Sequence, residues 1–143
     1  MKITQISVFL ENKKGRLKEI TKILSDNGIN IRALSIAETK DFGVIRLIVN
    51  KAEEAYTALK AMDFVVRKTD VLAVEVSDKP GGLYAVLEFL ETSGLNIEYM
   101  YAFVEKATDK ALLVMRFDDV DKAEVLLRDN SISMVAPDKV YNL

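Results

Sequence analysis

Asn12-Lys13-Lys14-Gly15-Arg16-Leu17 and, 66 residues further on (78 − 12), Asp78-Lys79-Pro80-Gly81-Gly82-Leu83 are two versions of one short loop. The same offset relates Asp26-Asn27-Gly28-Ile29-Asn30-Ile31 to Thr92-Ser93-Gly94-Leu95-Asn96-Ile97. A repeat of this period predicts two copies of one small domain. We therefore expect two domains, at residues 1–70 and 71–143.

Each half has the pattern of a βαββαβ unit. Alternating or continuous apolar stretches predict strands at residues 6–10, 30–38, 44–49 and 64–68 in the first half, and near 72–77, 97–104, 111–117 and 133–135 in the second. Helical spacing predicts helices over residues 17–27, 52–62, 83–93 and 120–128. This order predicts an α+β, ferredoxin-like fold for each half, with an antiparallel four-stranded sheet and both helices on one face.

The connection between the halves is short. Asp70-Val71-Leu72-Ala73-Val74 leads directly into the next strand, without a Pro/Gly/Ser-rich linker. Halves of about 70 residues lie near the lower limit for a self-sufficient core. We therefore expect the two domains to pack on each other as an intrachain pseudo-dimer.

The composition excludes several kinds of chemistry. The chain has no cysteine and no histidine, which removes disulfides, thiolate zinc sites, cysteine nucleophiles and the most frequent general base. A formal net charge of −2 gives no electrostatic footprint for nucleic acid or anionic membranes. No signal-peptide core or long apolar span is present, so we expect a cytoplasmic protein. We also expect that it requires no metal or cofactor.

Both loops and the helix ends that follow them resemble the ACT domain. Its usual pattern is a strand, an Asn/Asp-x-Pro-Gly-x-Leu loop, and a helix that ends in Gly-x-Asn-Ile. The resemblance covers the whole chain as a tandem pair. ACT domains are regulatory modules that bind amino acids and are commonly fused to enzymes of amino-acid metabolism. The resemblance implies a stand-alone, non-enzymatic sensor that binds a small amino acid between its two ACT domains and acts allosterically on a partner in amino-acid metabolism.

The resemblance also indicates which positions contact the ligand. The Asn before Pro-Gly and the Asn after the helix correspond to Asn12 and Asn30 in the first half, and to Asp78 and Asn96 in the second. A glycine at the mouth of a helix, with unpaired N–H groups beside it, suits the α-carboxylate of such a ligand. The predicted ligand-binding residues are Asn12, Lys14, Gly15, Arg16, Leu17, Asn30, Ile31, Asp78, Pro80, Gly81, Gly82, Leu83, Asn96 and Ile97.

The two loops depart from the family pattern in different ways. Lys14 stands where the family usually has proline, which adds a cation to the first loop. In the second, Asp78 replaces asparagine, and Gly82 follows Gly81 where the first loop has Arg16. We expect two inequivalent sites. In the structural alternative, the glycines only permit tight turns, and Asn12 and Asp78 cap the helices.

Tyr99, Tyr101 and Phe103 alternate along one predicted strand, opposite Met100 and Ala102. This stripe is an interface for a partner or a homodimer, or it is covered by the other half of the chain. A ligand-free ACT scaffold that only mediates assembly is the main alternative function. An RNA-binding module shares the βαββαβ order, but its basic, aromatic-rich strand is missing here, and no paired carboxylates suggest an enzyme.

Overall fold

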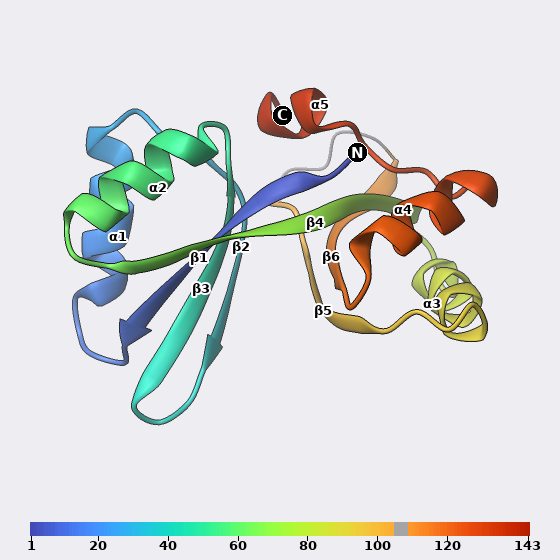
Figure 1. The fold of residues 1–143 in the computed structure, drawn as a ribbon, viewed down its shortest axis with the longest axis horizontal. Helices are drawn as coiled ribbons and strands as arrows, with labels where there is room; N and C mark the ends of the chain where they lie inside the picture. Colours follow the sequence, from blue (N-terminus) through green and yellow to red (C-terminus); the bar gives the residue numbers. More distant parts are fainter. Residues whose placement is uncertain (105–108) are drawn as a thin grey trace. The chain divides into compact units, whose positions relative to one another are not determined.

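The computed structural model describes residues 1–104 and 109–143 of the chain (Figure 1). Its internal contacts divide the chain into two units. The N-terminal unit is Thr4–Thr69, and the C-terminal unit consists of Met1–Ile3 together with Asp70–Leu143.

The N-terminal unit has a sheet with the strand order β2-β3-β1-β4 and two helices. Its elements are β1 (Ile3–Glu11), α1 (Arg16–Asp26), β2 (Ile31–Glu38), β3 (Phe42–Val49), α2 (Ala52–Ala61) and the beginning of β4 (Val65–Ser77). β1 and β2 both pair antiparallel with β3, so that Ile6 and Leu34 lie on either side of Leu47. β1 and β2 therefore run in the same direction, and both end near the Asn12 loop.

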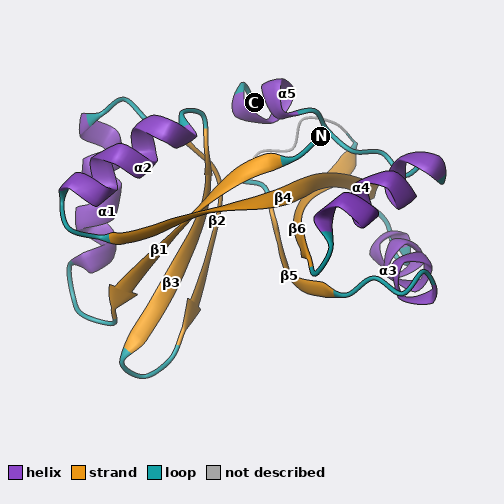
Figure 2. Cartoon of the chain, viewed as in Figure 1, coloured by secondary structure: helices purple, strands orange, loops and turns teal. Residues whose placement is uncertain are grey.

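The core of this unit lies between the sheet and its two helices (Figure 2). Every second residue of β1, namely Ile6 and Val8, faces Ile20 and Leu24 of α1 and Leu59 of α2, and all five are buried. The alternation of the strand and the spacing of the helices thus meet on one face, as the sequence predicts.

The C-terminal unit repeats this arrangement with the second part of β4. Its other elements are α3 (Gly82–Thr92), β5 (Ile97–Ala102), β6 (Lys110–Phe117), α4 (Val120–Asp129) and α5 (Pro137–Tyr141). β4 and β5 both pair antiparallel with β6. Leu72, Met115 and Phe117 of the sheet pack against Leu90 of α3 and Leu127 of α4. The ferredoxin-like α+β arrangement is confirmed.

Three details differ from the prediction. The two strands expected at residues 64–68 and 72–77 form one strand, β4, because no glycine or proline interrupts it. The strand expected at 133–135 is only a bridge between Met134 and Val74, because Ser131 is left-handed just before it and Pro137 follows it. The short helix α5 was not predicted, and its Val140 is fully buried.

The aromatic residues of β5 do not form an exposed stripe. Tyr99 and Tyr101 are half-buried, and Phe103, just beyond the strand, is buried. Met100 packs against the core of the C-terminal unit, as expected from the alternation of the strand. The stripe therefore offers less free surface than the sequence suggests.

The N-terminus of α4 has a side-chain cap that its counterpart in the N-terminal unit lacks. Asp119 accepts a hydrogen bond from the Lys122 N–H at 3.0 Å, whereas Lys51, at the corresponding position of α2, makes no such bond. We expect Asp119→Ala to lower the free energy of unfolding by about 1 kcal/mol. Lys51→Ala should change it by less than about 0.5 kcal/mol. Equal effects of the two substitutions in urea denaturation would show that the cap does not stabilise α4.

Candidate functional site

The two glycine loops have the same backbone conformation. Gly15 precedes α1 with φ +89°, and Gly81 precedes α3 with φ +86°. Both values lie in the left-handed region, which glycine adopts at little cost. The N-cap residue of each helix is this glycine, which has no side chain that could cap the helix, and the Asn12 side chain donates to the β2–β3 hairpin. The N-cap glycine itself therefore supplies no side-chain acceptor to the first-turn N–H groups of either helix.

The first loop borders a cavity of about 270 Å³. It is lined by the end of β1, the loop itself, the first turn of α1 and the end of β2, through Leu10, Glu11, Asn12, Lys13, Lys14, Gly15, Leu17, Ile36, Glu38 and Gly43. The Asn12 side chain donates through Nδ2 to the carbonyl oxygens of Thr39 (3.4 Å) and Lys40 (3.3 Å). Asn12 thereby ties the loop to the β2–β3 hairpin.

Charges of both signs surround this cavity. Lys13 Nζ lies 2.6 Å from Glu11 Oε2. The hydrogen bond from Lys13, and then its charge, lower the pKa of Glu11 below its usual value. Glu11 therefore remains ionised at neutral pH with its charge largely compensated, while Lys14 and Glu38 add a further cation and anion at the rim.

The second loop borders a cavity of about 420 Å³ built in the same way. Its lining consists of Val76, Ser77, Asp78, Lys79, Pro80, Leu83, Ala111 and Leu113. Gly82 holds this loop close to the preceding strand, because a Cβ at this position would lie 1.9 Å from the Ser77 carbonyl oxygen. The first loop accommodates Arg16 at the same point, so the two loops differ in their path as well as in their charge.

Comparison with known proteins identifies the family. A family model described as an ACT domain pair matches residues 1–143. The chain is an ACT domain pair. A protein of Bacteroides thetaiotaomicron, BT0572, is 42% identical over 100% of this chain and 98% of its own, with a TM-score of 0.92. No protein with a curated description matches the sequence.

Two solved structures of aspartate kinase regulatory subunits share the fold. The one from Thermus thermophilus has a TM-score of 0.64 and 19% identity. The one from Thermus flavus has a TM-score of 0.61 and 15% identity. Each match covers 87% of this ACT pair and 88% of the other chain.

The asparagines at the second strands lie away from the loops of their own units. Asn30 precedes β2, whose far end, Glu38, reaches the Asn12 loop. Seven residues of strand, at about 3.3 Å each, separate Ile31 from that end. Asn96 and Ile97 have the same position at the start of β5. Within one unit, then, the predicted loop residues and the predicted second-strand residues do not meet.

The main chains of Asn30 and Asn96 have matching structural roles. The Asn30 N–H donates to Asn50 Oδ1 at 2.9 Å, and the Asn50 N–H donates to the Asn30 carbonyl at 3.1 Å. Asn96 and Asp118 form the same reciprocal pair, at 3.2 and 3.1 Å. Both asparagine side chains are exposed, and within residues 1–104 and 109–143 neither makes a hydrogen bond.

Two further placements complete the site. Ile36 and Glu38 line the first cavity although the sequence did not single them out. The predicted strand order contained a signal for them. Because β1 and β2 run in the same direction, the end of β2, which carries Ile36 and Glu38, lies near the loop that follows β1. Arg16 lines a neighbouring cavity instead, where it pairs with Glu19 at 3.1 Å.

Two further features concern the described part of this ACT pair, residues 1–104 and 109–143. None of its helices there has the length and hydrophobicity needed to cross a membrane. In the same residues, no group of three or more acidic side chains is arranged to hold a metal ion. The neighbouring acids Asp118 and Asp119 accept hydrogen bonds from the main-chain N–H groups of Asn96 and Lys122, respectively.

Proposed function

We propose that this ACT pair is a non-enzymatic regulatory protein that binds a small α-amino acid at its glycine loops. The observation that carries the proposal is the occurrence, in both units, of a cavity beside a left-handed glycine at the N-cap of a helix. Such helix ends attract a carboxylate through their N–H groups and the helix dipole.

The first loop offers partners for both charged groups of an amino acid. Lys14 and the N-terminus of α1 suit the carboxylate. The Asn12 side-chain nitrogen Nδ2 donates to the hairpin carbonyls. The side-chain oxygen Oδ1 is therefore the atom of this amide that can accept a hydrogen bond from an ammonium group. Leu10, Leu17 and Ile36 provide apolar contact for a side chain.

The second loop supports the same function with a different charge. Asp78 favours an ammonium group and opposes a carboxylate close to it. Gly82 holds this loop close to the Ser77 carbonyl, and Pro80 and Leu83 line its cavity. We propose that the two sites differ in affinity.

The predicted contribution of Asn30 and Asn96 requires a second ACT domain. The loop and the start of the second strand lie at opposite ends of the same unit, so one ligand that touches both kinds of residue has to touch two ACT domains. In that arrangement, binding energy biases the relative orientation of the domains and can pass to a partner enzyme or regulator of amino-acid metabolism.

One observation favours assembly as a second candidate function. β2 is an edge strand in the strand order. Its residues Leu34 and Ile36, together with Leu17 of α1, are between 41% and 45% exposed. Exposed apolar side chains on an edge strand suit contact with a second chain. This surface supports a homodimer, and it would also serve a scaffold that binds no ligand.

Loop variants test the proposal. Asn12→Ala and Asp78→Ala should each weaken amino-acid binding at their own loop about tenfold, the cost of a lost charge-assisted hydrogen bond. Lys18→Ala is the control, because Lys18 is exposed on α1 and lines neither cavity. Calorimetric titration gives the affinities, and circular dichroism checks the fold. Unchanged affinities in both loop variants would overturn the assignment of the site.

A further inference from the structure

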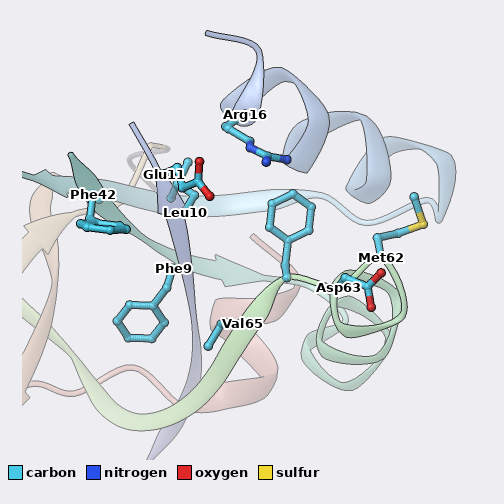
Figure 3. Close-up of a pocket in the computed structure, with 10 residues that line it drawn as sticks. Phe9, Leu10, Glu11, Arg16, Phe42, Met62, Asp63 and Val65 are labelled. Carbon is cyan, nitrogen blue, oxygen red and sulfur yellow. The ribbon is translucent and has the colours of Figure 1, made fainter. Parts of the chain in front are cut away.

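A second cavity of the N-terminal unit has a different character from the glycine-loop cavity. It measures about 480 Å³ and lies where β1 ends and β4 begins. Its apolar lining comes from Phe9, Phe42, Met62, Phe64 and Val65, and its charged lining from Glu11, Arg16 and Asp63 (Figure 3). We call it the Phe42 cavity.

Its apolar side chains are unusually exposed. Phe42 is 64% exposed, Val65 63% and Met62 56%. Figure 3 shows Phe9 and Phe42 on one side of the β1 ribbon, and Arg16, Met62 and Asp63 on the other, so the cavity wraps around the end of this strand. Large apolar side chains gathered around one cavity, with few polar groups, are typical of a small-molecule site.

The equivalent place in the C-terminal unit is polar and internally paired. The repeat relates Phe9, Phe42, Met62 and Val65 to Glu75, Lys110, Asn130 and Ser133. Asp63 and Ser131 confirm this alignment, because both are left-handed non-glycine residues, with φ +66° and +56°. Ser133 Oγ donates to Glu75 Oε2 at 3.0 Å, and Lys110 Nζ lies 3.8 Å from the same oxygen. The fold therefore does not require apolar residues at these positions.

The charges around the Phe42 cavity leave one carboxylate uncompensated. Arg16 is paired with Glu19 at 3.1 Å, and Glu11 with Lys13 at 2.6 Å. Asp63 is exposed, and its carboxylate makes no ion pair or hydrogen bond with any part of the chain that the structure describes. Asp63 is therefore the uncompensated carboxylate of the lining, while the Arg67 guanidinium, outside the lining, lies over the ring of Phe9.

The aromatic rings add to this preference. The face of an aromatic ring attracts cations. The protein already uses one ring in this way, since the Arg67 guanidinium lies 5.4 Å from the centre of Phe9. Phe42 and Phe64 have no such partner in the cation–ring contacts of the described residues.

We propose that the Phe42 cavity binds a small organic cation with an apolar body, of the class of arylalkyl or alkyl primary amines. The ammonium group pairs with Asp63, and the apolar body packs on Met62 and Phe64 and extends around the end of β1 toward Phe42. The Phe42 cavity shares Leu10, Glu11 and Gly43 with the glycine-loop cavity, but Asp63, Phe42 and Phe64 line the Phe42 cavity and not the other. The proposal therefore holds whether or not an amino acid binds at the loop.

Calorimetric titration of the full chain with phenethylamine tests the proposal, and 3-phenylpropionate serves as the probe of similar size and opposite charge. Phenethylamine should bind, and 3-phenylpropionate should bind at least about fivefold more weakly. Asp63→Asn, which tolerates a left-handed backbone, should weaken phenethylamine about twofold to fivefold. Phe42→Lys should weaken it at least about tenfold, because it replaces a ring by a like charge.

The matched control is Tyr84→Lys, which makes the same kind of change on α3 at a side chain that is 67% exposed. It should leave the affinity unchanged, as should Lys18→Ala, because Lys18 is exposed on α1 and lines neither cavity. A larger loss of phenethylamine binding in Lys14→Ala, whose residue lines the glycine-loop cavity and not the Phe42 cavity, than in Asp63→Asn would assign that binding to the loop and overturn the proposal. Equal or tighter binding of 3-phenylpropionate would also overturn it. An absence of phenethylamine binding would overturn the proposal as well. If sedimentation then shows a dimer that Phe42→Lys dissociates, these exposed apolar residues form a dimer interface.

Discussion

Replacing Gly82 by alanine is expected to lower the free energy of unfolding by about 3 kcal/mol, the upper part of the range for overpacking. The new Cβ would lie 1.9 Å from the Ser77 carbonyl oxygen and 2.9 Å from its carbonyl carbon. Both atoms belong to the backbone, so no side-chain rotation relieves the contact. The loop that carries Asp78 and Pro80 has to move, and the second glycine-loop cavity should change with it.

Arg16→Ala is the matched control, because Arg16 occupies the same position in the first loop. It removes an ion pair with Glu19 in which both side chains are partly exposed, and this should cost less than about 1 kcal/mol. Urea denaturation followed by circular dichroism measures both variants. A Gly82→Ala protein as stable as the parent would show that the second loop does not follow the described path.

Replacing Phe117 by alanine is expected to cost about 3 to 5 kcal/mol. Phe117 is fully buried at the end of β6, within the core of the C-terminal unit, and pairs with Ile97 of β5. Its removal leaves a cavity between the sheet and the helices. Because small domains are stable by only about 5 to 15 kcal/mol, the variant should unfold at markedly lower urea concentrations.

Val125→Ala provides the comparison within the same unit. Val125 lies on α4 and is 45% exposed, so its truncation should change the free energy of unfolding by no more than about 0.5 kcal/mol. Denaturation midpoints of the two variants should therefore differ clearly. Similar midpoints would place Phe117 outside the core.

The helices and most strands could be predicted because local signals agree with the tertiary structure. Helix α1 ends at Asp26, shortly before the left-handed Gly28, and its apolar spacing places Ile20 and Leu24 on the buried face. Two strands were predicted at residues 64–68 and 72–77, where the structure has the single strand β4. The polar residues Lys68, Thr69 and Asp70 lie at the junction between them. They are tolerated there because a strand can continue through polar residues when no glycine or proline interrupts it.

The end of the chain was harder to predict. Helix α5 has five residues, too few for a hydrophobic period to appear. Pro137 at its first turn was the available signal, since proline is favoured at this position. Residues 133–135 resemble a strand locally, but they form only a bridge, because Pro137 follows so closely.

The site could be predicted where it is local and not where it depends on distant elements. The repeated loops identified Gly15 and Gly81, and both have the left-handed conformation that the pattern favours. Ile36 and Glu38 come from the far end of another strand, so no spacing in the sequence connects them with the loop. The direction of a side chain such as Arg16, which lines the Phe42 cavity, depends on packing that a loop motif does not encode.

Thermal unfolding of the purified chain against each of the twenty amino acids at millimolar concentration tests the central proposal most directly. A ligand at a hundredfold excess over its Kd should stabilise the folded protein by about 2.7 kcal/mol, which corresponds to a rise of several degrees in Tm. Amino-acid binding at the glycine loops predicts such a rise for one chemical class, reduced by Asn12→Ala or Asp78→Ala. An unchanged Tm with all twenty amino acids would contradict it and favour a scaffold that binds no amino acid.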